Sequence, residues 1–156
     1  MRRPEREIKD EGTITGMLEK AVVGRLATVN RRGYPVIKPV NFLYADGRIY
    51  FHSSLKGEKI QDIRRGSPVC FEIDEPVGYV ATNGPACKAS FYYRSVVVKG
   101  KALLLRDRKR KMSIIEKLME KYQPEGGYQE ISEEILKKTA VVEITPVKIT
   151  GKENLG

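Results

Sequence analysis

Apolar residues recur at helical spacing in only a few short segments, while β-rich runs separated by turn residues fill most of the chain. Helical spacing predicts helices over 13–23, 57–65, 107–122 and 132–138. Alternating or β-branched runs predict strands over 25–29, 34–44, 48–53, 68–73, 91–105 and 140–150. The segment 75–89 has a weaker pattern, with three turn points and one short strand expected at 79–82.

The order of these elements predicts the fold class. Turn residues at 30–33 and the pair Asp46-Gly47 favour hairpins, so consecutive strands are expected to run antiparallel. The strand 140–150 is expected to pair with the long strand 91–105. We therefore predict a mainly β (α+β) chain with six to seven antiparallel strands forming a barrel, and helices at its periphery. A single domain is expected over 1–156, with a polar arm at 1–12 and a helical insertion at 107–138.

Composition narrows the class of protein further. Hydrophobic residues make up 40% of the 156 residues, enough for a buried core. No apolar run approaches the roughly 20 residues that cross a bilayer, and the mixed charges of the first residues do not fit a secretory signal. We expect a cytoplasmic protein without a membrane span. Two cysteines, Cys70 and Cys87, and one histidine, His52, are too few for a disulfide scaffold or a multi-histidine metal site, so no metal is expected.

The formal net charge of +9 raises the question of an anionic partner. Its distribution argues against nucleic acid, because the charges of residues 1–11 cancel and the one dense basic run, 106–111, opens a predicted helix. We interpret that run as a solvated helix face. A nucleic-acid partner is not expected.

The first candidate site residues lie around a proline in a predicted strand. Pro39 has no N–H to donate, so its strand is expected at a sheet edge or a bulge. An open edge would leave the backbone groups of Val40 and Asn41 free to bond a planar polar ligand. The alternative from the residues alone is an ordinary edge strand that the proline protects from pairing.

The second candidate segment runs from His52 through Ser53 and Ser54 to Gly57 and Lys59. A strand that ends in hydroxyl residues and passes a glycine into a helix can bind a phosphate, with Lys59 adding a positive charge. No nucleoside-triphosphate loop motif is present. A capped helix without a ligand is the alternative.

Taken together, these segments resemble a known family. Lys38-Pro39-Val40-Asn41-Phe42, the hairpin and strand 46–52, and the Gly57-to-Lys59 loop are similar to the FMN-binding split-barrel proteins related to pyridoxamine 5′-phosphate oxidase. The segments 24–28 and 95–102, with the opening Met1-Arg2-Arg3, resemble the Nim-type nitroimidazole-resistance branch. The resemblance is strong over about 1–105 and looser afterwards, and it implies that the barrel is split.

The resemblance also implies a cofactor and a place for it. Residues Lys38 to Phe42 would run along the flavin ring, His52 and Ser53 would touch the ring and the ribityl-phosphate side, and Gly57, Glu58 and Lys59 would hold the phosphate of FMN. Family members are homodimers with FMN at the interface, and Ser95 would reach the cofactor from the partner chain.

Two departures bear on the activity. Glu58 stands where the oxidases commonly have a basic residue, and the chain contains no Trp and lacks the C-terminal residues that bind pyridoxamine phosphate in those enzymes. A typical pyridoxamine phosphate oxidase is therefore not expected. We expect an oxidoreductase that passes electrons from a reduced nicotinamide to a small acceptor, with a nitroaromatic as one candidate.

His52 is the only candidate catalytic residue. It can contact the flavin, or donate a proton to an acceptor. A non-catalytic carrier or sensor of flavin, deazaflavin or haem is the alternative function, and a nucleic-acid-binding barrel is a remote one.

Overall fold

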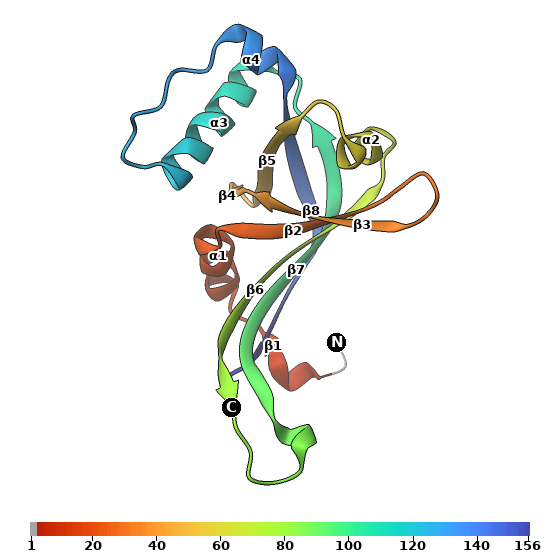
Figure 1. Ribbon diagram of the computed structural model, residues 1–156, viewed down its shortest axis with the longest axis vertical. Helices are drawn as coiled ribbons and strands as arrows, with labels where there is room; N and C mark the ends of the chain where they lie inside the picture. Colours follow the sequence, from red (N-terminus) through yellow and green to blue (C-terminus); the bar gives the residue numbers. More distant parts are fainter. Residues whose placement is uncertain (1–2) are drawn as a thin grey trace.

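A computed structural model describes residues 3–156, and Figure 1 shows their arrangement. The strands are β1 (Glu7–Ile8), β2 (Val23–Val29), β3 (Pro35–Asn41), β4 (Leu43–Ala45), β5 (Arg48–Ser54), β6 (Pro68–Val80), β7 (Ser90–Leu104) and β8 (Thr139–Asn154). The α-helices are α1 (Glu11–Lys20), α2 (Glu58–Arg64), α3 (Arg108–Tyr122) and α4 (Glu133–Lys138). Short 3₁₀ turns lie at Pro4–Arg6 and Ala86–Lys88.

All the strands belong to one antiparallel sheet with the order β3-β2-β6-β7-β8-β5-β4, and β1 pairs with β8. The two terminal strands of that order, β3 and β4, follow one another in the chain, with only Phe42 between them. The sheet must therefore curl until its ends meet, yet no ladder joins β3 to β4 or β5 among the described residues. The prediction of a split antiparallel barrel with peripheral helices is confirmed.

Two differences explain why eight strands are present instead of six or seven. The predicted strand 34–44 is interrupted at Phe42, which separates β3 from β4. The predicted polar arm 1–12 is also partly structured in its described portion, since Glu7 and Ile8 pair with Lys152 and Gly151. Ile8 is buried there, which anchors the arm. Residues 1 and 2, part of the motif quoted for the resemblance, lie outside the described residues.

The segment 75–89 was expected to contain three turn points and a short separate strand at 79–82, and the structure differs in its first part. Strand β6 continues to Val80 beside β7, and the register shift between Pro76 and Gly78 accommodates the proline as a bulge. The paired ends of β6 and β7 extend away from α3 and α4 as a long arm (Figure 1). We call residues 74–80 and 90–95 the β6–β7 arm.

Two apolar clusters hold the rest together. The larger lies inside the barrel and includes Phe42, Phe51 and Phe71, all fully buried. The smaller lies between α3, α4 and the outer face of β5 and β8, around Ile115 and Leu118. In residues 3–156, no helix has the length and apolar character to cross a membrane.

Candidate functional site

The split of the barrel forms a seam between β3 and β5. Strand β4 pairs only with residues 48–50 of β5, so residues 51–54 of β5 lie beyond its cover. Strands β3 and β5 also contact one another. Helix α2 follows β5 directly. The segments predicted to hold the ligand, 38–42 and 52–59, therefore come together at this seam.

Strand β3 is the free edge that Pro39 predicts, and the register shows which backbone groups face outward. The hairpin bond from the Asn30 N–H to the Tyr34 carbonyl, 2.8 Å, fixes the alternation of the β2–β3 ladder. Residues 34, 36, 38 and 40 then bond toward β2, whereas Pro35, Ile37, Pro39 and Asn41 present their backbone groups to the open edge. Both prolines fall at positions where an N–H has no ladder partner.

This alternation corrects part of the expectation. Asn41 has its N–H and carbonyl on the open side, but those of Val40 face its ladder partner Gly24. The Val40 side chain is buried and Phe42 is fully buried, so neither side chain lies on the exposed surface of the seam. The backbone groups of Phe42 are also occupied, because the Tyr122 hydroxyl bonds both its N–H and its carbonyl. Of the strand's candidates, Asn41 and the Pro39 carbonyl remain available to a ligand.

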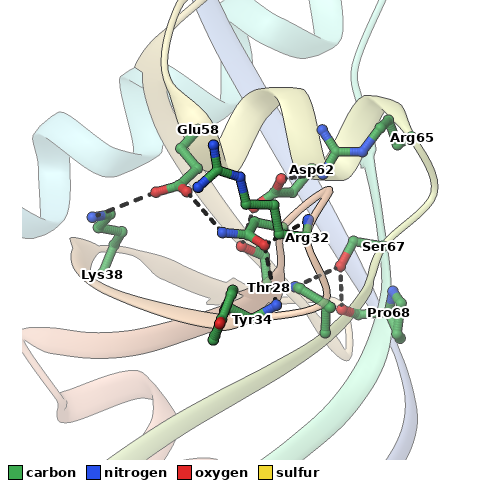
Figure 2. Close-up of polar contacts among 11 residues, drawn as sticks. Thr28, Arg32, Tyr34, Lys38, Glu58, Asp62, Arg65, Ser67 and Pro68 are labelled. Carbon is green, nitrogen blue, oxygen red and sulfur yellow. Dashed lines mark hydrogen bonds and ion pairs between the residues drawn. The ribbon is translucent and has the colours of Figure 1, made fainter.

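Polar side chains cross the seam from β3 to α2 (Figure 2). The Lys38 ammonium lies 4.0 Å from one carboxylate oxygen of Glu58, and the Asn30 amide donates to the other oxygen at 3.3 Å. Glu58 is thus turned toward β3 and its turn. No carboxylate pairs with Lys59 anywhere in residues 3–156, which leaves its charge available.

The end of β5 provides small polar groups. The His52 side chain is in part exposed, and partial burial together with the nearby Lys59 ammonium lowers its pKa, which favours the neutral imidazole. The Ser54 hydroxyl oxygen accepts the Lys56 N–H at 3.2 Å and retains its own proton for donation. Gly57, with φ of 121°, turns the chain into α2 and has open space where a side chain would be. Ser53 lies beside Ala140 of β8 and is half-buried.

A buried polar network fixes α2 against β2 below these groups (Figure 2). Asp62 is 1% exposed, accepts the Thr28 hydroxyl at 2.7 Å and forms an ion pair with Arg65. Ser67 accepts the N–H of Val29 at 2.9 Å. These contacts attach the second half of α2 and the residues after it to β2.

Ser95 is not part of this grouping within one chain. It lies on β7, between Asp74 of β6 and Lys152 of β8, two strands from β5 in the sheet. Its expected contact with the cofactor from a partner chain stays a prediction.

Two clefts of the described residues lie elsewhere. One of about 680 Å³ separates α1 from β6 and β7 and is lined by Thr13, Lys20, Glu75 and Arg94 among others. A second of about 350 Å³ lies between α3 and residues 128–131. None of the predicted site residues lines either cleft. In the part of the chain that the structure describes, no three His, Cys, Asp or Glu side chains are placed to hold a metal ion.

The basic run 106–111 has a structural role that its sequence did not reveal. Arg110 bonds the buried Glu143 at 2.6 Å, Arg108 pairs with Glu133, and Lys111 donates to the Leu136 carbonyl at 2.7 Å. These contacts join α3 to α4 and β8, so the run is not simply a solvated helix face. Sequence patterns also missed Lys121 and Tyr122, which contact residues about 80 to 100 positions earlier in the chain.

Comparisons with known proteins agree with this architecture. A proposed 5-nitroimidazole antibiotic resistance protein from Bacteroides thetaiotaomicron superposes with a TM-score of 0.80 at 23% identity, over 94% of this chain and 86% of that one. A flavocytochrome from Azotobacter vinelandii gives 0.89 at 20% identity, over 100% and 72%. A FAD- and haem-binding protein from Mycobacterium smegmatis gives 0.88 at 17% identity, over 97% and 74%. No curated protein matches.

The sequence itself carries the family assignment. A profile of the pyridoxamine 5′-phosphate oxidase family matches residues 10–153, which extends the likeness through the C-terminal third that seemed looser from motifs alone. The chain belongs to this family of split-barrel proteins.

Proposed function

We propose that the protein binds a flavin at the seam, with FMN as its cofactor, and acts as an oxidoreductase. The observation that carries the proposal is the seam itself: an open strand edge, two hydroxyls and an unpaired lysine converge there in a chain of this family. When bound, the flavin supplies the redox chemistry, passing electrons from a reduced nicotinamide to a small acceptor.

The donor set of the seam fits such a cofactor. The Asn41 N–H and carbonyl and the Pro39 carbonyl offer one donor and two acceptors in a row, which suits the polar edge of a flat heterocycle. Ser53, Ser54 and Lys59, next to the open turn at Gly57, suit a phosphate. Lys38 is expected to contribute to cofactor binding by pairing with Glu58, because its positive charge offsets the negative charge of the carboxylate.

His52 is proposed to contact the cofactor. Its lowered pKa leaves it neutral, so it can hold a hydrogen bond at the ring without adding a charge. Proton donation to an acceptor is the finer role. It requires the imidazole to be protonated first, which its pKa disfavours at neutral pH.

A second copy of the chain is proposed to cover the seam. The outer edge of β3 has no ladder partner among the described residues of the single chain. The β6–β7 arm exposes three large apolar side chains, Val77, Tyr79 and Phe91, which a protein partner can bury. In a homodimer, Ser95 on this arm would reach the partner's cofactor.

A carrier or sensor without turnover is the second candidate. It is supported by the fold's likeness to a flavocytochrome and to a protein that binds FAD and haem. The nitroaromatic acceptor draws support only from the likeness to the proposed nitroimidazole resistance protein.

A visible absorption spectrum of the purified protein tests the proposal, before and after FMN is added and dialysed. Retained flavin bands that a reduced nicotinamide bleaches, and that a nitroaromatic restores without oxygen, are the expected result. Bands that no nicotinamide bleaches would favour the carrier. A protein that retains no flavin would contradict the proposal, and haem and deazaflavin would then be titrated.

A further inference from the structure

The Tyr122 hydroxyl lies between the ends of β2 and β3. Its oxygen accepts the Phe42 N–H at 2.8 Å and donates to the Val22 carbonyl at 2.7 Å, while the Phe42 carbonyl lies 3.0 Å away as a second acceptor. Tyr122 is the last residue of α3, about 80 to 100 positions from these partners. A single hydroxyl therefore bonds two strands at once.

The register explains what this hydroxyl replaces. The last pair of the β2–β3 ladder is Val23 with Asn41, and the next pair would join Val22 to Phe42. By the alternation of the ladder, this next pair would be hydrogen-bonded directly. The tyrosine oxygen occupies that place instead, so the strands separate by the width of one hydroxyl. Strand β3 ends at Asn41, and the chain can turn into β4.

Lys121 adds a second attachment beside it. Its ammonium donates to the Ala21 carbonyl at 2.8 Å and lies 4.3 Å from the centre of the Phe42 ring. Phe42 is fully buried and meets Phe71 edge-on, with ring centres 4.8 Å apart. Both the backbone and the ring of Phe42 are thus fixed from α3 and the core.

We propose that Tyr122 is a positioning residue for the ligand-binding edge of β3. Its hydroxyl fixes the peptide groups on the C-terminal side of Asn41, and thereby the direction of the Asn41 N–H and carbonyl at the open edge. The inference rests on the proposed function, in which these groups face the flavin ring. It also gives α3 a role in cofactor binding, although this helix packs on the opposite side of β4 and β5 from the barrel interior.

The test compares Tyr122→Phe with Tyr128→Phe, a matched control on the exposed loop after α3, where Tyr128 forms no side-chain hydrogen bond to a described residue. In flavin-free protein, Tyr122→Phe is expected to speed amide hydrogen exchange at Phe42 by about tenfold, as for the loss of one buried hydrogen bond. The Kd for FMN is expected to rise by about tenfold, with a shifted visible band of the bound flavin. Tyr128→Phe should change none of these.

The outcomes separate this inference from the proposed function. If the wild-type protein binds no flavin, the proposed function fails, and the inference about flavin positioning fails with it. The exchange data would still show whether the Tyr122 hydroxyl holds the Phe42 peptide group. If the wild type binds FMN and Tyr122→Phe binds it equally well with an unshifted band, the proposed function stands and the inference is overturned. Should Tyr122→Phe fail to fold, Lys121→Met replaces it. A rise in Kd of about threefold is then expected for the lost Ala21 bond, and an unchanged Kd and band would overturn the inference.

Discussion

The seam and the β6–β7 arm of this sheet meet their surroundings in opposite ways. At the seam, the polar groups of β2, β3 and α2 bond to one another, and Asp62 is buried with both of its partners in place. Along the β6–β7 arm, Tyr79 and Phe91 pack against each other at 5.7 Å but remain more than half exposed. The seam therefore satisfies much of its polarity within one chain, whereas the arm presents apolar surface for which the chain has no cover of its own.

The largest effect is expected from a change inside the barrel. In Gly24→Ala, the added Cβ would lie 1.9 Å from the Cζ of Phe71, a ring that is fully buried in the core. We expect the free energy of unfolding to fall by about 3 kcal/mol, as for severe overpacking of a core. Urea denaturation followed by far-UV circular dichroism measures it.

Gly16→Ala is the matched control. Gly16 lies in α1 with nothing within 4 Å of the added Cβ, so alanine should raise stability by up to about 1 kcal/mol through its helix propensity. Equal losses in the two variants would show that the contact with Phe71 is not what makes position 24 sensitive.

The arm is expected to respond in assembly rather than in stability. In the double variant Tyr79→Ser with Phe91→Ser, the dissociation constant of the proposed dimer should rise at least about tenfold, or about 1.4 kcal/mol. Sedimentation velocity over a concentration series measures it. Thermal unfolding at low protein concentration should change little, since these side chains are exposed in the single chain.

Ser95→Trp sharpens this prediction from within the same arm. If Ser95 reaches the partner's cofactor, the larger ring should weaken FMN binding while the dimer persists. A variant that stays a flavin-loaded dimer with unchanged affinity would remove Ser95 from the site.

The two regions also differ in how much of their structure can be predicted from the sequence. Local signals were sufficient for the hairpins: Asp46 and Gly47 adopt φ of 51° and 70°, and the prolines of β3 mark its free edge. The break at Phe42 was not predictable, because it depends on a hydroxyl of Tyr122 far along the chain. In the arm, Pro76 and Gly78 suggested turns, yet the pairing with β7 extends through them as a bulge.

The candidate site shows the same limit. The sequence identified which segments meet at the seam, since a proline, two serines and a glycine carry their meaning locally. Which peptide groups face outward depends on the alternation of the ladder. The peptide groups of Val40, next to Pro39, are excluded from the open edge only once the pairing of β3 with β2 is known. The direction of Glu58 likewise depends on Asn30 and Lys38, which lie on another element.

At the seam, two charge changes are expected to act in opposite directions. Lys59→Ala should raise the Kd for FMN by about tenfold, because a phosphate would lose a charged partner at a partly exposed position. Glu58→Gln should lower it by about threefold, because it removes a negative charge and releases Lys38. Equilibrium dialysis with FMN and with riboflavin measures both.

Riboflavin lacks the phosphate and serves as the internal control, so both variants should bind riboflavin with the affinity of the wild-type protein. Lys99→Ala, an exposed lysine on β7, controls for net charge. An effect of equal size on riboflavin and FMN would place Lys59 near the ring instead of the phosphate.

The smallest expected effect is on the pH dependence of stability, to which His52 at the seam and Glu72, two residues before the β6–β7 arm, contribute with opposite signs. Burial and Lys59 lower the pKa of His52 below its ordinary 6.5, so the unfolded chain takes up this proton first as the pH falls. The free energy of unfolding should therefore decline as the pH falls from 6.5 to the lower pKa of the folded state.

Glu72 acts in the opposite direction, because burial and the neighbouring Asp74 raise its pKa above its ordinary 4.5, despite Arg25. The folded state takes up that proton first, so stability should increase as the pH falls toward 4.5.

Urea midpoints measured from pH 8 to pH 4 in His52→Gln and Glu72→Gln separate the two contributions. Each is expected to stay below about 0.5 kcal/mol, since His52 is exposed and Glu72 is only partly covered. His52→Gln should flatten the upper part of the profile, and because His52 is the only histidine, no other imidazole can replace it. Saturating FMN should deepen the upper step if His52 contacts the cofactor as a neutral group, because protonation would then cost binding as well as folding. An upper step that FMN leaves unchanged would mean that His52 lies outside the cofactor's reach.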